Sequence, residues 1–204
     1  MNKPRFDLVI VGVGGQGTLL ASKILGRLAM SAGCQVKVSE VHGMSQRGGS
    51  VITHVRVGEQ IHAPLVSVGQ ADFLVSFEAV EAARAASYLK PGGIAITSTQ
   101  RIAPMSVITG SAEYPSDPFI ALGNHPVVKV DALALALEAG NQKAVNLVLL
   151  GMLSRYLPFA REAWEQAIAL SVPRATLSVN IAAFTKGAAY ADGVRQAPGA
   201  AIPQ

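Results

Sequence analysis

The sequence predicts an α/β fold with a doubly wound, mostly parallel sheet and a helical C-terminal section. First, an apolar run at residues 6–11 stops at a cluster of glycines, and a helix-periodic apolar stretch follows at once. Second, short Val- and Ile-rich runs alternate with helical patterns up to residue 130, as expected when crossover helices connect parallel strands. Third, helical patterns alone follow residue 131.

The expected elements are bounded by glycine, proline and capping residues. Strands are expected at residues 6–11, 35–38, 51–57, 72–76, 94–97 and 127–130. Helices are expected at residues 15–32, 78–89, 132–138, 143–156, 161–170 and 175–189. Gly58-Glu59 predicts a turn, so that residues 51–63 form an antiparallel hairpin addition. We expect residues 1–189 to form one domain and residues 190–204 to form a flexible tail.

The predicted helix at 143–156 is apolar on nearly every face. Such a helix either lies in the centre of the fold or is covered by another chain, and we expect an obligate interface here.

Composition excludes several classes of protein. The 204 residues contain one cysteine, Cys34, so the chain alone cannot hold a disulfide or an iron–sulfur cluster. The net charge of +4 is spread thinly and aromatic residues make up 5%, which disfavours nucleic-acid binding. There is no apolar run long enough to span a membrane and no signal-peptide pattern, so a cytoplasmic location is expected.

The first chemical motif is the glycine loop after the first predicted strand. Gly12, Gly14 and Gly17 fit the dinucleotide fingerprint of a Rossmann-like first βαβ unit. Backbone N–H groups at the following helix N-terminus favour an anion such as a phosphate. Glu40, roughly 20 residues further on, stands where an acid would bind a ribose hydroxyl, which would favour NAD. Alternatively, the glycines only let the first helix cross close to the sheet.

The second motif follows the second predicted strand, at the same carboxyl edge of the sheet where ligands bind in open α/β folds. Arg47 offers a forked cationic donor suited to phosphate or carboxylate, or alternatively pairs with Glu40. His42 is a candidate base or proton relay, but we favour a structural histidine that is held by hydrogen bonds. Glu78 and Glu81 follow a later strand, and we interpret them as acids that favour a helix N-terminus.

Three strings then resemble a known family. They are Val11-Gly12-Val13-Gly14-Gly15-Gln16-Gly17, Ser39-Glu40-Val41-His42-Gly43-Met44-Ser45-Gln46-Arg47-Gly48-Gly49-Ser50, and Asn146-Leu147-Val148-Leu149-Leu150-Gly151. From about residue 6 to residue 187 the chain closely resembles the gamma-type subunit of 2-oxoacid:ferredoxin oxidoreductases. The long central string is similar to the branch that acts on indolepyruvate.

The resemblance implies a reaction and a division of labour. A 2-oxoacid is decarboxylated on thiamine diphosphate, the acyl unit passes to coenzyme A, and electrons leave through iron–sulfur clusters to ferredoxin. The chain has no Gly-Asp-Gly triplet of the kind that begins the usual thiamine motif, so thiamine diphosphate, Mg and the clusters are expected on a larger partner subunit. Neither a nucleic acid nor a membrane is expected as a partner. No catalytic residue is assigned.

The candidate cofactor-binding residues, which would contact coenzyme A, are Gly12, Gly14, Gly15, Gln16, Gly17, Ser45, Gln46, Arg47, Gly48, Gly49 and Ser50. Three alternatives stay open at this point. Both loops could be interface elements that touch no cofactor. The chain could be a standalone NAD- or nucleotide-binding regulatory module. It could also be a purely structural assembly subunit.

Overall fold

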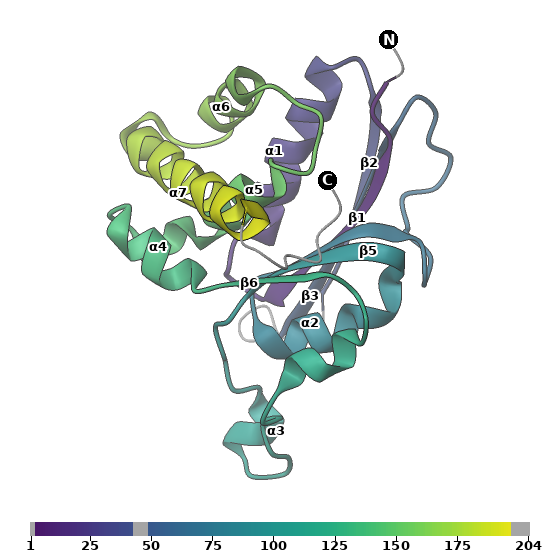
Figure 1. The fold of residues 1–204 in the computed structure, drawn as a ribbon, viewed down its shortest axis with the longest axis vertical. Helices are drawn as coiled ribbons and strands as arrows, with labels where there is room; N and C mark the ends of the chain where they lie inside the picture. Colours follow the sequence, from purple (N-terminus) through teal and green to yellow (C-terminus); the bar gives the residue numbers. More distant parts are fainter. Residues whose placement is uncertain (1–2, 43–48, 197–204) are drawn as a thin grey trace.

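The computed structural model describes residues 3–42 and 49–196 and shows a six-stranded sheet with helices on both faces (Figure 1). The strand order is β2-β3-β1-β4-β5-β6. The strands are β1 Phe6–Val13, β2 Gln35–His42, β3 Ser50–Gly58, β4 Ala71–Ser76, β5 Leu89–Ser98 and β6 Val127–Val130. The α/β class and the mostly parallel sheet are therefore confirmed.

Two hydrophobic clusters lie on opposite faces of the sheet, because successive side chains of a strand point to opposite sides. On β1, Leu8 and Ile10 join the larger cluster, and Val9 and Val11 join the smaller one. The larger cluster packs under α1 Thr18–Ser31, α4 Ala132–Glu138, α5 Val145–Leu153, α6 Arg161–Ala169 and α7 Leu177–Gln196. The smaller cluster packs under α2 Ala79–Ala85 and the 3₁₀ turn Pro118–Leu122.

The predicted hairpin at residues 51–63 is wrong in its second half. β3 lies inside the sheet, antiparallel to β1 on one side and to β2 on the other. Both edges of β3 are thus already paired, and residues 60–63, which have no edge left to pair with, are irregular. The antiparallel addition is β3 itself. The first β-α-β unit is Rossmann-like in direction only, because β3 separates β2 from β1.

Three boundaries also differ from the prediction. α1 begins at Thr18 rather than residue 15, because Gly15 and Gly17 have φ of 99° and 92°, outside the helical region. β5 begins at Leu89 rather than at residue 94, and its pairing with β4 shifts register over this added stretch. At residues 143–156, a 3₁₀ turn, Gln142–Ala144, precedes a shorter helix, α5.

The last helix is longer than expected. α7 continues to Gln196, so the prediction of a flexible segment from residue 190 is wrong as far as residue 196. The hydroxyl of Tyr190 donates to the Lys129 carbonyl at 3.0 Å, and Asp192 pairs with Arg155 at 2.6 Å. These contacts stabilise residues 190–196 as a helix, although the composition of this segment alone does not favour one. Residues 197–204 lie outside the described part of the chain.

The apolar helix α5 is covered by this chain rather than by another one. All nine of its residues are buried. A Cβ on Gly151 would lie 2.0 Å from the Phe184 carbonyl oxygen, and one on Gly187 of α7 would lie 1.9 Å from the Val148 carbonyl oxygen. The two helices thus cross with their backbones in contact. The expectation of an obligate interface on this helix is wrong, because α7 fills that place.

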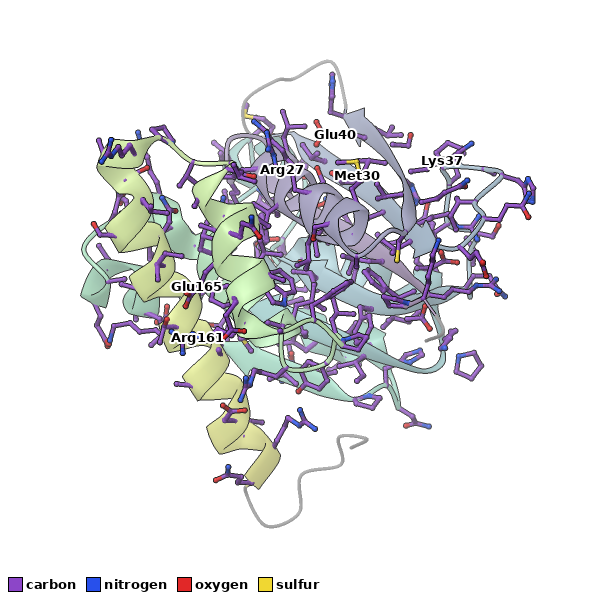
Figure 2. The ribbon with its side chains drawn as sticks, turned by 90° about the horizontal axis from the view of Figure 1, so that it is seen from above. Arg27, Met30, Lys37, Glu40, Arg161 and Glu165 are labelled. Carbon is purple, nitrogen blue, oxygen red and sulfur yellow. The ribbon has the colours of Figure 1, made fainter. Side chains whose placement is uncertain are left out.

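Outer helices are joined by polar contacts. Figure 2 shows Arg161 and Glu165 together on α6, where their side chains pair at 2.7 Å. Arg161 also donates to the Thr185 hydroxyl of α7 at 3.1 Å. Within residues 3–42 and 49–196, no helix has both the length and the apolar character needed to cross a bilayer.

Candidate functional site

The two glycine loops meet at the carboxyl edge of the sheet. β1 pairs with β3 in a register that sets Val13 opposite Ser50, where the first loop begins and the second ends. One step further, the Gly14 N–H donates to the Gly49 carbonyl at 2.8 Å. The antiparallel insertion of β3 therefore brings the two loops into direct contact, which the linear sequence does not reveal.

The glycines of the first loop serve different ends. A Cβ on Gly12 would lie 3.1 Å from the Phe77 Cβ, and one on Gly17 would lie 2.6 Å from the Asn146 Nδ2, so these two permit close packing. Gly15 has a positive φ and nothing within 4 Å of its Cβ position. The packing interpretation thus holds for Gly12 and Gly17, whereas Gly15 leaves open space in front of its backbone.

The side chain of Gln16 turns into the fold and braces the loop. Its Oε1 accepts from the Val13 N–H at 2.7 Å, and its Nε2 donates to the Phe77 carbonyl at 3.1 Å. The same Nε2 lies 3.3 Å from the Gln100 Oε1. One amide therefore links the ends of β1, β4 and β5. These ends lie next to the topological switch point, where the strand order of the sheet reverses.

A cavity of about 510 Å³ lies on one side of the first loop. The N-terminal ends of α1 and α5 border it, and neither helix has a side-chain cap. Lys143 adds an ammonium group, and Gln100 and Asn146 add amides. Helix N-termini and a lysine favour an anion, so this cavity suits a phosphate group.

A second cavity, of about 300 Å³, lies on the other side of the loop and has a different charge. It is lined by Gly14, Thr18, His42 and the half-buried Glu40, among others. The Glu40 carboxylate accepts from the hydroxyls of Thr53 at 3.1 Å and Thr18 at 3.5 Å. Figure 2 shows Glu40 near one end of β2 and Lys37 further along the same strand. A carboxylate here opposes an anion and favours a hydroxyl or amine ligand.

Two buried carboxylates, Glu78 and Glu81, lie at the N-terminal end of α2. Glu78 is 1% exposed and caps α2 by accepting from the Glu81 N–H at 2.9 Å, so its expected role at a helix N-terminus is confirmed. It also accepts from the Ile102 N–H at 3.0 Å and from the Tyr114 hydroxyl. Burial, and then the hydrogen bond to Glu78, raise the pKa of Tyr114 to about 12.

Glu81 carries the connection to the second loop, because its carboxylate accepts from the Ser50 hydroxyl. On its other side it pairs with Arg84 at 2.9 Å. Glu81 therefore ties the start of β3 to α2 in addition to placing an acid in the first helical turn.

The candidate residues can now be placed. The structure brings together at one edge Gly12, Gly14, Gly15, Gln16, Gly17, Gly49 and Ser50. Four candidates, Ser45, Gln46, Arg47 and Gly48, lie outside the described residues. Sequence reasoning missed Gln100, Lys143 and Asn146, which line the larger cavity. Of these three, only Asn146 was indicated by the sequence, because it begins the third string that resembles the family. Its position beside the glycine loop depends on how α5 packs.

Comparisons with known proteins agree with this architecture. The profile of the family described as "Pyruvate ferredoxin/flavodoxin oxidoreductase" matches residues 7–190. The indolepyruvate oxidoreductase subunit IorB of Thermococcus kodakarensis is 44% identical over 189 residues, covering 89% of this chain and 94% of that protein. IorB of Archaeoglobus fulgidus is 41% identical, covering 90% and 94%.

Solved structures show the same fold. The gamma subunit of a keto/oxoacid ferredoxin oxidoreductase from Geobacter sulfurreducens has a TM-score of 0.71 at 24% identity, covering 93% of this chain and 99% of that one. A 2-oxoglutarate:ferredoxin oxidoreductase from Magnetococcus marinus has a TM-score of 0.70 at 18% identity, covering 99% of this chain but 33% of that one. The chain therefore belongs to the pyruvate ferredoxin/flavodoxin oxidoreductase family, as a small subunit of a 2-oxoacid oxidoreductase.

Proposed function

We propose that the chain is the non-cluster subunit of an aryl-pyruvate-type 2-oxoacid:ferredoxin oxidoreductase, with indolepyruvate as its substrate. It completes the active site of a larger subunit that carries thiamine diphosphate, Mg and the iron–sulfur clusters, and electrons leave the complex to ferredoxin. The observation that carries this proposal is the 44% identity to an indolepyruvate oxidoreductase subunit over nearly the whole of both chains.

The division of labour is supported by the ligands that this chain offers. A single cysteine in 204 residues cannot bind a cluster that needs about four thiolates. In the part of the chain that the structure describes, no three His, Cys, Asp or Glu side chains form a group that could hold a metal ion. The Magnetococcus match, which occupies a third of a longer chain, supports a close association between this fold and a larger partner.

The lining of the cavity beside Lys143 suits a phosphate group of coenzyme A. Gly15 leaves its backbone open, the N-termini of α1 and α5 border the space, and the Lys143 ammonium adds a full positive charge. These groups would hold a coenzyme A phosphate, while Gln16 fixes the loop that presents them. When bound, coenzyme A supplies the thiol that accepts the acyl unit. The chain's own contribution is to bind and orient the phosphate end of that ligand.

The decisive experiment is to produce the chain together with the larger subunit and to measure ferredoxin reduction with indolepyruvate, pyruvate and 2-oxoglutarate in the presence of coenzyme A. We expect turnover with indolepyruvate to be much faster than with the other two acids, and none from the small chain alone. Equal rates with all three acids, or turnover by the lone chain, would contradict the proposal.

A charge variant tests the coenzyme A contact. Lys143→Gln removes a cation from the phosphate-compatible cavity, so the KM for coenzyme A should rise about tenfold with little change in kcat. Lys186→Gln is the matched control, because that lysine pairs with Glu138 on the surface. Arg47→Ala should also raise this KM if the second loop faces the same cleft. An unchanged KM in both the Lys143 and Arg47 variants would favour loops that only form an interface.

One observation favours a second function, a standalone NAD- or nucleotide-binding module. Glu40 lines a cavity together with the glycine loop, as an acid that binds a ribose would. The insertion of β3 between β1 and β2 weakens this alternative, because the usual neighbouring strands are separated. Calorimetric titration of the purified chain with NAD and with coenzyme A separates the two, and micromolar NAD binding would support the module.

A further inference from the structure

The segment between β5 and the 3₁₀ turn at Pro118 projects from the carboxyl edge of the sheet. In Figure 1 this segment, residues 99–117 with the short helix α3 Met105–Ile108, extends away from the sheet and from the other helices. It leaves the same sheet edge as the two glycine loops, because β5 is parallel to β4 and β1. We call residues 99–117 the projecting loop.

The base of the projecting loop is firmly held. The buried carboxylate of Glu78 accepts from the Ile102 N–H on the outgoing side and from the Tyr114 hydroxyl on the returning side. The Arg101 guanidinium stacks 4.4 Å from the centre of the Tyr114 ring and donates to the Ser116 carbonyl at 3.2 Å. A buried carboxylate is costly unless it accepts hydrogen bonds. Because donors to Glu78 come from both sides of the loop, losing either side would leave this carboxylate less well satisfied, and both sides are therefore held in place.

The tip is internally ordered although it projects from the body. The Thr109 hydroxyl donates to the Met105 carbonyl at 2.9 Å, and the Ser111 hydroxyl donates to the Ser106 carbonyl at 2.9 Å. Gly110, with φ of 75°, ends the helical turn in the left-handed region. The tip is thus preformed, which lowers the entropy lost when such a segment binds another molecule.

The surface of the tip has the character of an interface core. Residues 102–112 contain no charged side chain. Met105 and Ile108, one helical turn apart on α3, are each 65% exposed. Single exposed apolar residues are common on proteins, but a charge-free segment with two of them on a clamped projection matches the depletion of charge at interface centres.

We propose that the projecting loop is a docking element that inserts Met105 and Ile108 into an uncharged, apolar groove of the larger cofactor-carrying subunit, beside the glycine loops. This inference rests on the proposed function: if the chain completes the larger subunit's active site beside the glycine loops, that subunit covers the carboxyl edge where these loops lie. A protein that covers this edge also contacts the projecting loop, because the projecting loop and the glycine loops leave the sheet at the same edge. The insertion closes one side of the cleft in which coenzyme A would bind.

A second copy of this chain is a poorer occupant. A cavity of about 320 Å³ lies at the opposite edge, where β1 and β4 begin, and is lined by Phe6, Phe73 and Leu157 but also by the charged Arg5, Asp72 and Lys90. Docking of the loop into that cavity would join copies head to tail. Such heterologous contacts form open filaments unless the rotation closes a ring.

The test measures the affinity of the full chain for the larger subunit, identified by its thiamine and iron content, with the wild type and with Met105→Ser/Ile108→Ser. Burying the exposed part of each apolar side chain corresponds to about tenfold in affinity, so the double variant should raise Kd by about 10- to 100-fold. The matched control is Ile120→Ser, because Ile120 is 76% exposed and lies just outside the loop. Its Kd should not change.

Hydrogen exchange of the wild-type complex supplies a readout that needs no variant. Backbone amides of residues 102–112 should gain protection when the larger subunit binds. The inference fails, and the proposed function stands, if an active complex forms with unprotected loop amides and with an unchanged Kd for the double variant. If no complex forms with the wild type, the proposed function fails. Filaments of the wild-type chain that the double variant abolishes would assign the loop to a second copy and overturn the proposal.

Discussion

Replacing Gln16 by alanine tests whether the glycine loop is held by one half-buried amide. The substitution removes the acceptor 2.7 Å from the Val13 N–H and the donor 3.1 Å from the Phe77 carbonyl. Leaving the Val13 N–H without an acceptor costs about 1–3 kcal/mol. Leaving the Phe77 carbonyl without this donor costs less, because a carbonyl oxygen has two lone pairs. We therefore expect a loss of about 2 kcal/mol in the free energy of unfolding.

The assay is urea unfolding of the purified chain, followed by the KM for coenzyme A in the assembled enzyme. The KM should rise because the open backbone of Gly15 is no longer fixed. Gln142→Ala is the control, since that exposed amide lines the same cavity without bracing the loop. In a double-mutant cycle, Gln100→Ala should add less than its own effect, because its contact with Gln16 is already lost. A stability change below about 0.5 kcal/mol would refute the bracing argument.

Three further predictions follow from the packing and the buried polar groups. Gly151→Ala should cost about 3 kcal/mol or more, because the new Cβ would overlap the Phe184 carbonyl, whereas Gly193→Ala on α7 meets open space and should be neutral or stabilising in thermal unfolding. Burial lowers the pKa of His54 below its usual 6.5, so the neutral form stabilises the fold above that pH and this stability is lost as pH falls. Urea midpoints at pH 7.5 and 5.5 should differ less in His54→Gln than in the wild type, and an equal difference would exclude His54 as the cause. Glu78→Gln should cost about 2 kcal/mol and speed hydrogen exchange in residues 99–117, and unchanged exchange would show that the carboxylate does not hold that loop.

The fold class could be predicted from the sequence because the relevant signals are local. Alternation of Val- and Ile-rich runs with helical periodicity gave the correct kind of element for most of the first 130 residues. Asp131, directly before the helix predicted at 132–138, caps α4 by accepting from the Ala134 N–H at 2.9 Å. The glycine loop was equally visible, because a positive φ at Gly15 and Gly17 is a property of the turn itself.

Tertiary structure decided the rest, because the deciding contacts join residues far apart in the chain. Strand order is not encoded in any single strand, so the insertion of β3 and the resulting Gly14–Gly49 contact could not be derived from periodicity. The packing of α7 over α5 depends on Gly151 and Gly187, which lie on different helices. The sequence by itself determined the order and kind of most strands and helices and the position of the glycine turn. Long-range packing alone determined that this turn lies between a cavity with Lys143 and a cavity with Glu40.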